Sequence, residues 1–473
     1  MTDYELVVGI ETHVQLKTRT KLFCGCALQF GAPPNTQVCP VCLGHPGSLP
    51  VLNRQAFELG LRAALALNCS IASWTKFDRK NYFYPDLPKN YQISQYDMPF
   101  SSKGWVEIES GKKVGITRAH LEEDAGKLIH EEKGTRSFID LNRTGTPLVE
   151  IVTEPDMRSA DEAYQYMNAL RTILQYAGVS DCDMEKGELR CDINLSIRPR
   201  GQEKFGTKTE IKNLNSFKNA KAALEYEHAR QIRALDGGEK IIQSTLLWDA
   251  ENNKTRLMRT KEEAHDYRYF PEPDLPPVRV TQDWIDRVKA QIPELPAAKR
   301  LRFAQQYQLS DYDAKVLSFD RAMADFFEQA ATLSGKPKPV ANWLVNELNK
   351  ILNEKKIEMA AVKMTPKALV ELIAMVETGK LTGASAKEVF ADIVESGKSP
   401  ADVVQAKGLA KIADTGAIET AAKAAIAANP KAVADFKSGK EAALKSLIGG
   451  IMKQTKGQAD AKLAEEALRK LLS

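Results

Sequence analysis

Four cysteines near the start of the chain have the spacing of metal ligands. Cys24 and Cys26 form a C-x-C pair, and Cys39 and Cys42 form a C-x-x-C pair after twelve intervening residues. Two such pairs joined by a loop supply the four thiolates of a tetrahedral zinc site. Because four protein ligands leave no position open for water or substrate, we expect a structural zinc here and the reaction elsewhere.

Two other interpretations of these cysteines remain open. They could be free thiols, or the C-x-x-C pair could be a redox centre, which would need neither Cys24 nor Cys26. His45 could also replace one of the thiolates. The total of seven cysteines is odd and suits a reducing compartment better than a disulfide framework. The three cysteines outside the cluster are then ordinary thiols.

Acidic residues form the second group that could do chemistry, because several of them interrupt apolar, strand-like runs. They are Glu11 in GIETHVQL, Glu122, Glu123 and Asp124 in RAHLEEDAGK, Glu150 in TPLVEIV, Asp192 in LRCDINLSI and Glu210 in TKTEIKN. Taken singly, each is more often a solvated or salt-bridged carboxylate than a functional one. Glu11 and His13, however, share one strand face by their spacing of two. A set of carboxylates with an imidazole suits Mg²⁺ or Mn²⁺.

The elements that position these residues are strands mixed with separated helices. β-Branched or aromatic runs such as YELVVGIETHVQL, SFIDLNR and RCDINLSIRP predict strands up to about Pro277. Ser159 and Glu162 form a capping box ahead of one helix, and a second helical run starts at Phe217 and ends at Gly237-Gly238. This mixture predicts an α+β domain with much antiparallel sheet.

The chain after the proline-rich residues 270–278 reads as helix. Thr365 and Ser399 each precede a proline at a first helical position, and Ser385 with Glu388 reads as another capping box. Near Lys407 the composition changes to Ala/Lys-rich helices. We therefore expect a mixed or antiparallel sheet domain over 1–290, an all-α helical domain over 291–405, and a small α-helical tail domain over 406–473.

The net charge of +4 is concentrated in that tail. Residues 407–473 hold twelve Lys or Arg against seven Asp or Glu, a balance of +5. Such a segment indicates an anionic partner, of which RNA is the commonest, although a solvated helical face is the simpler explanation. No run of about 18 apolar residues predicts a membrane span. The acidic start argues against a targeting peptide, so we expect a cytoplasmic protein.

Longer motifs carry a resemblance to a known family. FDRKNYFYPDLPKNYQISQYD (residues 77–97), VGIETHVQL, AHLEEDAGK, LNRTGTPLVEIVTEPD and RCDINLSI resemble the B subunits of the glutamine-dependent aspartyl/glutamyl-tRNA amidotransferases. The likeness continues through RYFPEPDLPP and NWLVNELNK into the basic tail and so covers essentially the whole chain. It implies an α+β cradle domain, a helical domain and a tail domain that binds tRNA.

The resemblance also implies a function and partners. Family members are ligases that form a carbon–nitrogen bond with glutamine as amide donor. The B subunit uses ATP to phosphorylate the side-chain carboxylate of misacylated Glu-tRNA(Gln) or Asp-tRNA(Asn). An amidase A subunit supplies ammonia through a channel, and a small C subunit joins A to B. An alternative from another class is a zinc-bearing, tRNA-binding assembly factor without catalysis.

Matching motif to motif, the resemblance implies a set of site residues. Glu11, His13, Glu123 and Glu150 are expected to hold Mg²⁺ or Mn²⁺ at the kinase site, with Asp192 and Glu210 lining the same pocket. Glu123 also matches a residue at the mouth of the ammonia channel, where a carboxylate could take a proton from ammonium.

Two further features of the long motif allow more than one interpretation. The segment from Asn81 to Asn90, with Arg79 nearby, could meet nucleotide phosphates or the tRNA acceptor end. The aromatic residues 82–84 are expected to belong to the core rather than to stack on a base.

Overall fold

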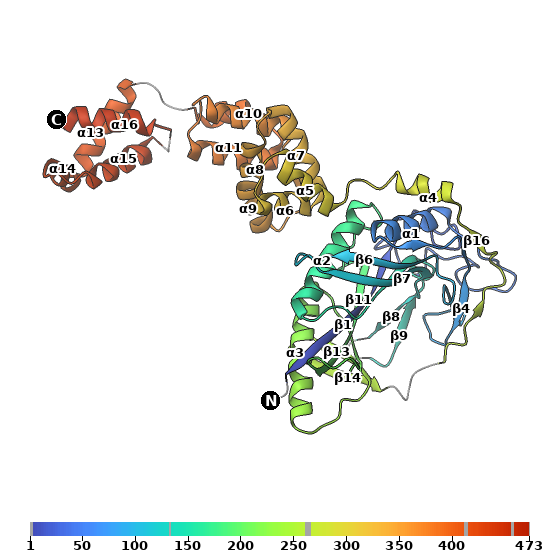
Figure 1. Cartoon of the computed structure of the whole chain (residues 1–473). Coiled ribbons are helices and arrows are strands. Elements are labelled where there is room, and N and C mark those ends of the chain that lie inside the picture. Colours follow the sequence, from blue (N-terminus) through green and yellow to red (C-terminus); the bar gives the residue numbers. More distant parts are fainter. Residues whose placement is uncertain (1–2, 132–133, 261–265, 411–414, 456–457, 473) are drawn as a thin grey trace. The chain divides into compact units, whose positions relative to one another are not determined.

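The computed structural model describes the chain except residues 1–2, 132–133, 261–265, 411–414, 456–457 and 473, which are traced in grey in Figure 1. The chain divides into two compact units, Met1–Leu295 and Pro296–Ser473. The first combines sheets with helices and the second is helical, so the predicted α+β fold class followed by helical domains is confirmed. None of the helices among the described residues is both long and apolar enough to cross a membrane.

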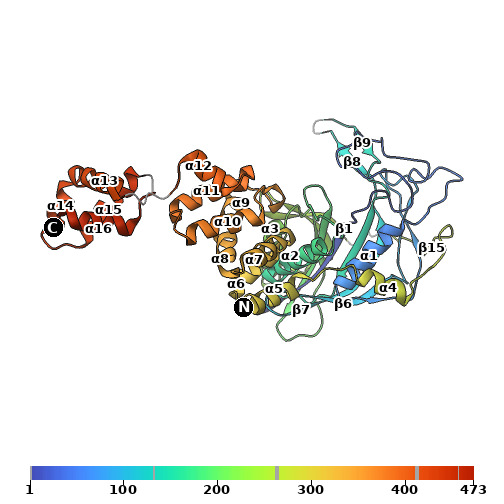
Figure 2. The ribbon, with the colours of Figure 1, turned by 90° about the horizontal axis from the view of Figure 1, so that it is seen from above.

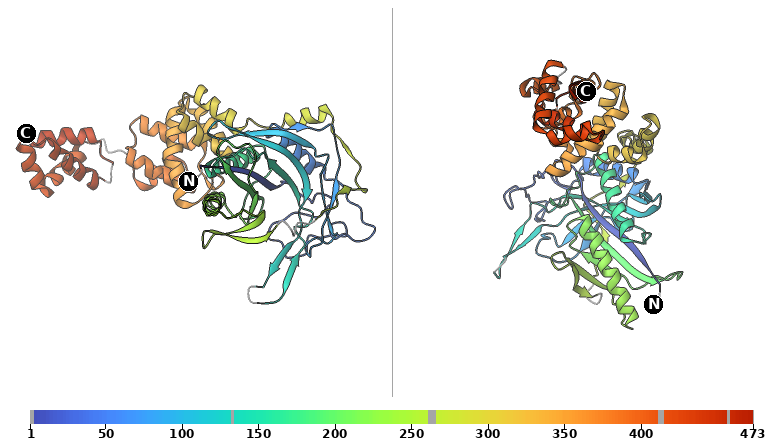
Figure 3. Two further views of the ribbon diagram at one scale, coloured as in Figure 1. Left: turned by 60° about the horizontal axis from the view of Figure 1, so that its bottom comes forward. Right: turned by 90° about the vertical axis from the view of Figure 1, so that its left-hand side faces the viewer.

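A nine-stranded mixed sheet organises the first unit, in the order β14-β13-β12-β11-β1-β10-β7-β6-β2. All neighbouring strands are antiparallel except β12 and β13, which are parallel. Their bounds are β1 Tyr4–Gln15, β2 Ser70–Ile71, β6 Ser101–Glu107, β7 Lys113–Glu123, β10 Pro147–Thr153, β11 Leu189–Pro199, β12 Thr209–Lys212, β13 Ser244–Asp249 and β14 Lys254–Thr260. Figure 3 shows that this sheet is strongly curved.

Alternation along β1 explains how the sheet separates core from site. Its even-numbered side chains, such as Val8, Ile10 and Val14, are buried in the main hydrophobic core, whereas Glu11 and His13 point to the other face. The helices α1 (Arg54–Ala66), α2 (Ala160–Tyr176) and α3 (Phe217–Asp236) pack on the core face, and α2 and α3 lie side by side in Figure 1. The charged residues are therefore left on the face that these helices do not cover.

The helix starts that the sequence predicted in this unit are confirmed. The Ser159 hydroxyl accepts a hydrogen bond from the Glu162 amide at the start of α2, although the Glu162 carboxylate accepts from the Arg158 amide rather than from that of Ser159. Helix α3 starts at Phe217 and is capped by Gly237 at its end. These local signals depend on residues three or four apart, which is why the sequence reports them well.

Three small sheets complete the first unit. Their strands are β15-β4-β5, β16-β3 and β8-β9, with bounds β3 Trp74–Thr75, β4 Asp78–Asn81, β5 Tyr91–Ser94, β8 Lys127–His130, β9 Ser137–Asp140, β15 Phe270–Pro271 and β16 Val278–Arg279. The β8–β9 ribbon extends away from the large sheet (Figures 2 and 3), while α4 (Gln282–Lys289) packs against α1. Strand β5 packs against the end of β7, which brings β4 and β5 close to the charged face.

The second unit consists of short helices, and side chains cap the starts of α6, α7, α10, α11 and α12. Thr365 and Ser399 cap α10 and α12 as predicted, but the capping box expected at Ser385 is wrong, because Thr382 caps α11 and Ser385 lies inside its first turn. The bounds are α5 Pro296–Gln306, α6 Asp311–Phe319, α7 Arg321–Ser334, α8 Pro337–Asn342, a π-helix η2 Trp343–Leu348, α9 Asn349–Lys355, a 3₁₀ turn η3 Met359–Ala361, α10 Pro366–Glu377, α11 Gly383–Ser396 and α12 Pro400–Lys407.

The last four helices share a core of their own. They are α13 Thr415–Ala428, α14 Pro430–Lys437, α15 Ala442–Gln454 and α16 Ala461–Leu472. Ile418, Leu447, Ile451 and Leu468 are almost fully buried within this core. The lysines of these helices lie outside it, and those at 423, 445 and 462 are exposed.

Candidate functional site

A row of polar side chains crosses four neighbouring strands of the large sheet, β7, β10, β1 and β11. His13 on β1 lies opposite Glu150 on β10, and Glu150 lies opposite His120 on β7. On the other side of β1, Glu11 lies opposite Asp192 on β11. Residues directly opposite one another in a sheet point to the same face, so the ladder alone brings side chains from distant motifs together.

The tightest group in this row contains His13, Glu122 and Glu150. One ligand atom from each lies within 4.8 Å of the others. His13 Nε2 is 3.3 Å from Glu122 Oε1 and 3.7 Å from Glu150 Oε2, and His120 Nε2 is 3.2 Å from the same Glu150 oxygen. We call His13, Glu122 and Glu150 the acidic cluster. Two carboxylates and an imidazole at this spacing fit a divalent cation such as Mg²⁺ or Mn²⁺.

The local field keeps one carboxylate of the cluster ionised. Burial alone would raise the pKa of Glu150, but His120, His13 and Lys80 outweigh it and hold that pKa well below its ordinary value. Glu11 behaves in the opposite way, because burial and the nearby charge of Glu150 raise its pKa. The Asn194 amide donates a 2.9 Å hydrogen bond to Glu11 Oε1.

The structure places Glu122, and not the predicted Glu123, beside His13 and Glu150 in this cluster. Glu123 lies opposite Pro147 in the ladder, on the other face from His120 and Glu122. Its carboxylate is bound by the Lys89 ammonium and by the Ile93 amide, which donates over 2.9 Å. A single step along a strand reverses the direction of the side chain, so Glu122 takes the expected place of Glu123.

The remaining predicted residues lie farther along the row. Lys212 Nζ is 2.5 Å from Asp192 Oδ2 and 3.1 Å from Glu210 Oε1, so one ammonium joins these two carboxylates. Burial opposes the ionised form of Glu210, but Lys212 and Thr245 outweigh it and lower its pKa. Glu210 lines a cavity of about 170 Å³ and Glu11 lines another of about 260 Å³. Lys208 borders both.

An aromatic group beside the acidic cluster was not expected from the sequence. Tyr82, Tyr267, Tyr269 and Tyr96 form a chain of ring contacts, with centroid distances of 6.0 Å, 6.1 Å and 4.2 Å between successive rings. We call these four tyrosines the aromatic wall. Lys80 lies over two of them, 4.9 Å from the Tyr267 ring centroid and 6.0 Å from that of Tyr82.

The expectation that residues 82–84 belong to the core is wrong: Tyr82 is half-buried and lies outside the main hydrophobic core, and the other two are exposed. Phe83 and Tyr84 are 83% and 53% exposed, respectively. Both lie just beyond the last residue of β4, Asn81, where strand alternation no longer predicts which side chain is covered.

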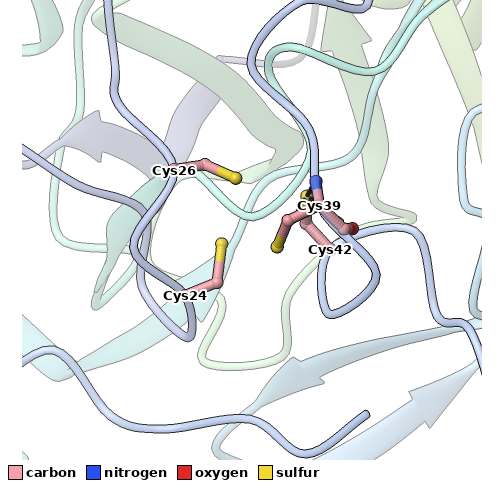
Figure 4. A group of neighbouring side chains, drawn as sticks. All are labelled: Cys24, Cys26, Cys39 and Cys42. Carbon is pink, nitrogen blue, oxygen red and sulfur yellow. Dashed lines mark hydrogen bonds between the residues drawn. The ribbon is translucent and has the colours of Figure 1, made fainter.

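The four predicted zinc ligands converge. Cys24 and Cys26 come from one segment of the loop between β1 and α1, and Cys39 and Cys42 come from another (Figure 4). One sulfur atom from each lies within 4.8 Å of the others. Among the described residues this group contains no fifth ligand, and His45 is not part of it. Four thiols at this spacing fit a closed, tetrahedral metal site.

A buried lysine supports the cysteine group from behind. Lys21 is fully buried, and its ammonium lies 3.6 Å from Cys42 Sγ. The Cys39 amide also donates to this sulfur, over 3.2 Å. The Cys24 thiol contributes most, and together with the Cys39 amide and the Lys21 ammonium it outweighs burial, lowers the pKa of Cys42 and favours the thiolate. A thiolate is the form that binds metal.

The cysteine group and Glu123 meet at one glycine. Gly145 has a φ of +81°, and a Cβ placed on it would lie 3.4 Å from Lys21 Cδ, 3.7 Å from Cys42 Cβ and 3.8 Å from Glu123 Oε2. Any side chain at this position would therefore be strained and would touch all three neighbours. The loop that carries the cysteines thus lies next to the end of β7, where Glu123 is located.

Comparison with known proteins agrees with this geometry. The model of the GatB/GatE catalytic domain matches residues 6–286, and that of the GatB domain matches residues 325–472. The chain is 52% identical to a protein of Carboxydothermus hydrogenoformans and 52% identical to one of Brevibacillus brevis, with complete coverage of both chains in each case. A third relative, from Persephonella marina, is 50% identical over 99% of this chain and 100% of its own. All three are named as the B subunit of an aspartyl/glutamyl-tRNA(Asn/Gln) amidotransferase. The family resemblance is confirmed, and the chain belongs to the B subunits of the aspartyl/glutamyl-tRNA(Asn/Gln) amidotransferases.

Proposed function

We propose that this chain uses ATP to activate, and ammonia to amidate, the side-chain carboxylate of Glu-tRNA(Gln) or Asp-tRNA(Asn). It does so as part of a glutamine-dependent ligase in which an A subunit releases the ammonia and a C subunit joins A to B. The observation that supports this proposal is the convergence of His13, Glu122 and Glu150 on one face of the large sheet.

Activation is needed because an ionised carboxylate resists attack by ammonia. Its charge is delocalised, and the oxide that would have to leave is very basic. In the first step a carboxylate oxygen bonds to the γ-phosphorus of ATP, and the bond from that phosphorus to the β–γ bridging oxygen breaks, so ADP leaves with the electron pair. In the second step ammonia bonds to the acyl carbon, the bond to the phosphate oxygen breaks, and the nitrogen loses a proton. The products are the amide, ADP and phosphate.

The acidic cluster serves the first step. Mg²⁺ or Mn²⁺, when bound there, neutralises negative charge that spreads over the phosphoryl oxygens. Glu150 is suited to hold a cation because its neighbours keep it ionised. His120 contacts Glu150 from the far side and orients its carboxylate. Glu11 lies on the same face of the sheet as the acidic cluster and lines the 260 Å³ cavity.

Glu123 serves the second step. It is only 2% exposed, and its carboxylate pairs with the Lys89 ammonium and accepts a hydrogen bond from the Ile93 amide. A carboxylate held at the mouth of the ammonia channel can take a proton from ammonium, so that neutral ammonia reaches the acyl phosphate. Asp192 and Glu210 are joined by Lys212 beyond Glu11 in the same row, and Glu210 lines the 170 Å³ cavity.

The other two parts of the proposal concern scaffold and substrate binding. Cys24, Cys26, Cys39 and Cys42 hold a structural zinc, because four thiolates leave no open position for a reaction. The basic helices α13–α16 bind the tRNA through its phosphates and shape.

Co-expression with A and C subunits tests the proposal. The wild-type complex should convert Glu-tRNA(Gln) to Gln-tRNA(Gln) with glutamine and ATP, and should release ADP only when charged tRNA is present. Glu150→Gln should reduce amidation at least ~100-fold while glutaminase activity remains measurable. Glu154→Gln is the matched control, because Glu154 is exposed beyond the end of β10 and contacts Thr117. Binding of tRNA without ADP release by the wild-type complex would instead favour the non-catalytic assembly factor.

A further inference from the structure

Lys80 is a cation at the acidic cluster that the reaction described above does not use. It lies on β4, in the small sheet that packs against the end of β7, and its ammonium lies over the Tyr267 and Tyr82 rings. Within the part of the chain that the structure describes, this ammonium makes no hydrogen bond and no ion pair. It nevertheless lies close enough to Glu122 and Glu150 to interact with their charges.

The neighbouring cations of the same segment behave differently. Lys76 is paired with Asp78 and Asp97, and Arg79 is paired with Glu272 through two hydrogen bonds of 2.7 and 2.8 Å. Lys89 binds the carboxylate of Glu123. Each of these cations has a fixed acidic partner and can be explained by stability alone. Lys80 cannot be explained in this way.

A structural counter-ion for the acidic cluster would touch its carboxylates. Lys212 shows such a contact, at 2.5 Å from Asp192 and 3.1 Å from Glu210. The Lys80 ammonium is instead supported by aromatic faces, which hold a cation without satisfying its hydrogen-bond donors. Its three N–H donors therefore remain available to a ligand, and its charge acts on Glu122 and Glu150.

The Lys80 ammonium does not touch the carboxylates of the acidic cluster. If those carboxylates hold a divalent ion, an anion can bind between that ion and the ammonium. Phosphate groups are bound in this way, by a divalent ion on one side and a lysine acting as a point charge on the other. The aromatic wall also limits where the lysine can move, so the charge is already in place before the anion arrives.

We propose that Lys80 contacts the phosphoryl group while it passes from ATP to the side-chain carboxylate of the aminoacyl-tRNA. This inference rests on the proposed function and adds a catalytic residue to it. Lys80 donates hydrogen bonds to a non-bridging oxygen of the γ-phosphate as the new bond to the carboxylate oxygen forms and the bond to ADP breaks. It keeps all its protons, so its role is to stabilise charge.

The first test uses the complete A, B and C complex with Glu-tRNA(Gln) and ATP. Lys80→Met should reduce the kcat for ADP formation at least ~100-fold, as loss of one transition-state donor does elsewhere. Lys80→Arg should recover part of that loss because it keeps the charge. Lys113→Met is the matched control: Lys113 also lies over an aromatic ring, 3.8 Å from the centroid of Trp105, but at the far end of β7. A fall of less than tenfold in Lys80→Met, or an equal fall in Lys113→Met, would overturn the proposal.

A second measurement separates contact with the phosphoryl group from a structural role. The wild-type complex with Mg²⁺ should bind ADP with aluminium fluoride, a mimic of the group in transfer, more tightly than ADP alone. Lys80→Met should lose most of this difference while its affinity for Mn²⁺ is not weakened. If the Met variant does not assemble, Lys80→Gln replaces it in both measurements. A preserved difference would refute the role of Lys80, whereas failure of the wild-type complex to form ADP would refute the proposed function itself.

Discussion

Separate substitution of Glu122 and Glu123, the two neighbouring glutamates on β7, gives the sharpest test of the acidic cluster. Glu122→Gln should weaken Mn²⁺ binding strongly, because Glu122 Oε1 is 3.3 Å from His13 Nε2 and shares the cluster with Glu150. Glu123→Gln should leave Mn²⁺ binding nearly unchanged, because Glu123 points to the other face. The two residues are equally buried, at 3% and 2% exposure, so burial does not distinguish them.

The size of the expected difference follows from the ligand count. Glu122 and Glu150 supply two negative charges, and Glu122→Gln removes one of them together with one oxygen donor of high affinity. Groups that merely orient a metal ligand typically change metal affinity 10- to 100-fold, so loss of a ligand should exceed ~100-fold, or about 2.8 kcal/mol. In Glu123→Gln the amide oxygen can still accept from Lys89 and Ile93, so Mn²⁺ affinity should change by less than ~3-fold.

Titration calorimetry with Mn²⁺ on zinc-loaded protein measures both affinities directly. Amidation assays on the same variants provide an independent reading, because Glu123→Gln should impair use of ammonia while ADP formation continues. If Glu123→Gln lost Mn²⁺ and Glu122→Gln kept it, the strand register described above would not be the one that forms the site, and the assignment of Glu122 would be refuted.

Three further outcomes are expected. Cys39→Ser should release zinc, as metal analysis would report, and should lower Tm by about 5–10 °C, equivalent to roughly 2–4 kcal/mol; a variant that keeps its zinc and its Tm would contradict the closed four-thiolate site. In zinc-loaded protein without Mg²⁺ or Mn²⁺, Glu11 should contribute a fall in stability, measured as the difference between wild type and Glu11→Gln, as pH rises above the ordinary glutamate pKa of about 4.3, because the folded state raises the pKa of Glu11 and so holds its proton longer than the unfolded chain. Thermal unfolding between pH 4 and 7 measures this fall, which Glu11→Gln should remove; an identical pH profile in the variant would exclude Glu11 as its source. Removal of the residues after Lys407 should weaken tRNA binding and reduce the salt dependence by about 0.7–0.9 per lost phosphate contact, and an unchanged slope in filter binding would mean that the tail lysines only solvate the helices.

The local parts of this structure could be predicted from the sequence because their causes are local. The alternation in GIETHVQL placed Glu11 and His13 on one face, and the register of β1 bears this out. The two caps that precede a proline, Thr365 and Ser399, form as expected. At Ser385 the same kind of signal failed, because a second candidate, Thr382, lies one turn earlier and forms the cap instead.

The parts that depend on strand register could not be predicted in the same way. AHLEEDAGK contains three acidic residues in a row, and only the pairing of β7 with β10 decides which of them faces His13. His120 could have been noticed, since it precedes Glu122 by two residues and must share its face. Lys80 gave no such signal, because its surroundings include Tyr267 and Tyr269, which lie almost two hundred residues away in the chain.

Gly145 brings the cysteine group closer to Glu123 than to the acidic cluster. Lys21, Cys42 and the Glu123 carboxylate all lie within 4 Å of the position that a Cβ on this residue would take, whereas the acidic cluster lies on the opposite face of the strand. If Glu123 and the acidic cluster have the proposed roles, loosening of the cysteine loop would disturb the use of ammonia before it disturbs the use of ATP. Zinc-depleted enzyme would then continue to consume ATP on charged tRNA while forming little amide. ATP consumption would thus be uncoupled from amidation, and the enzyme would not be simply inactive.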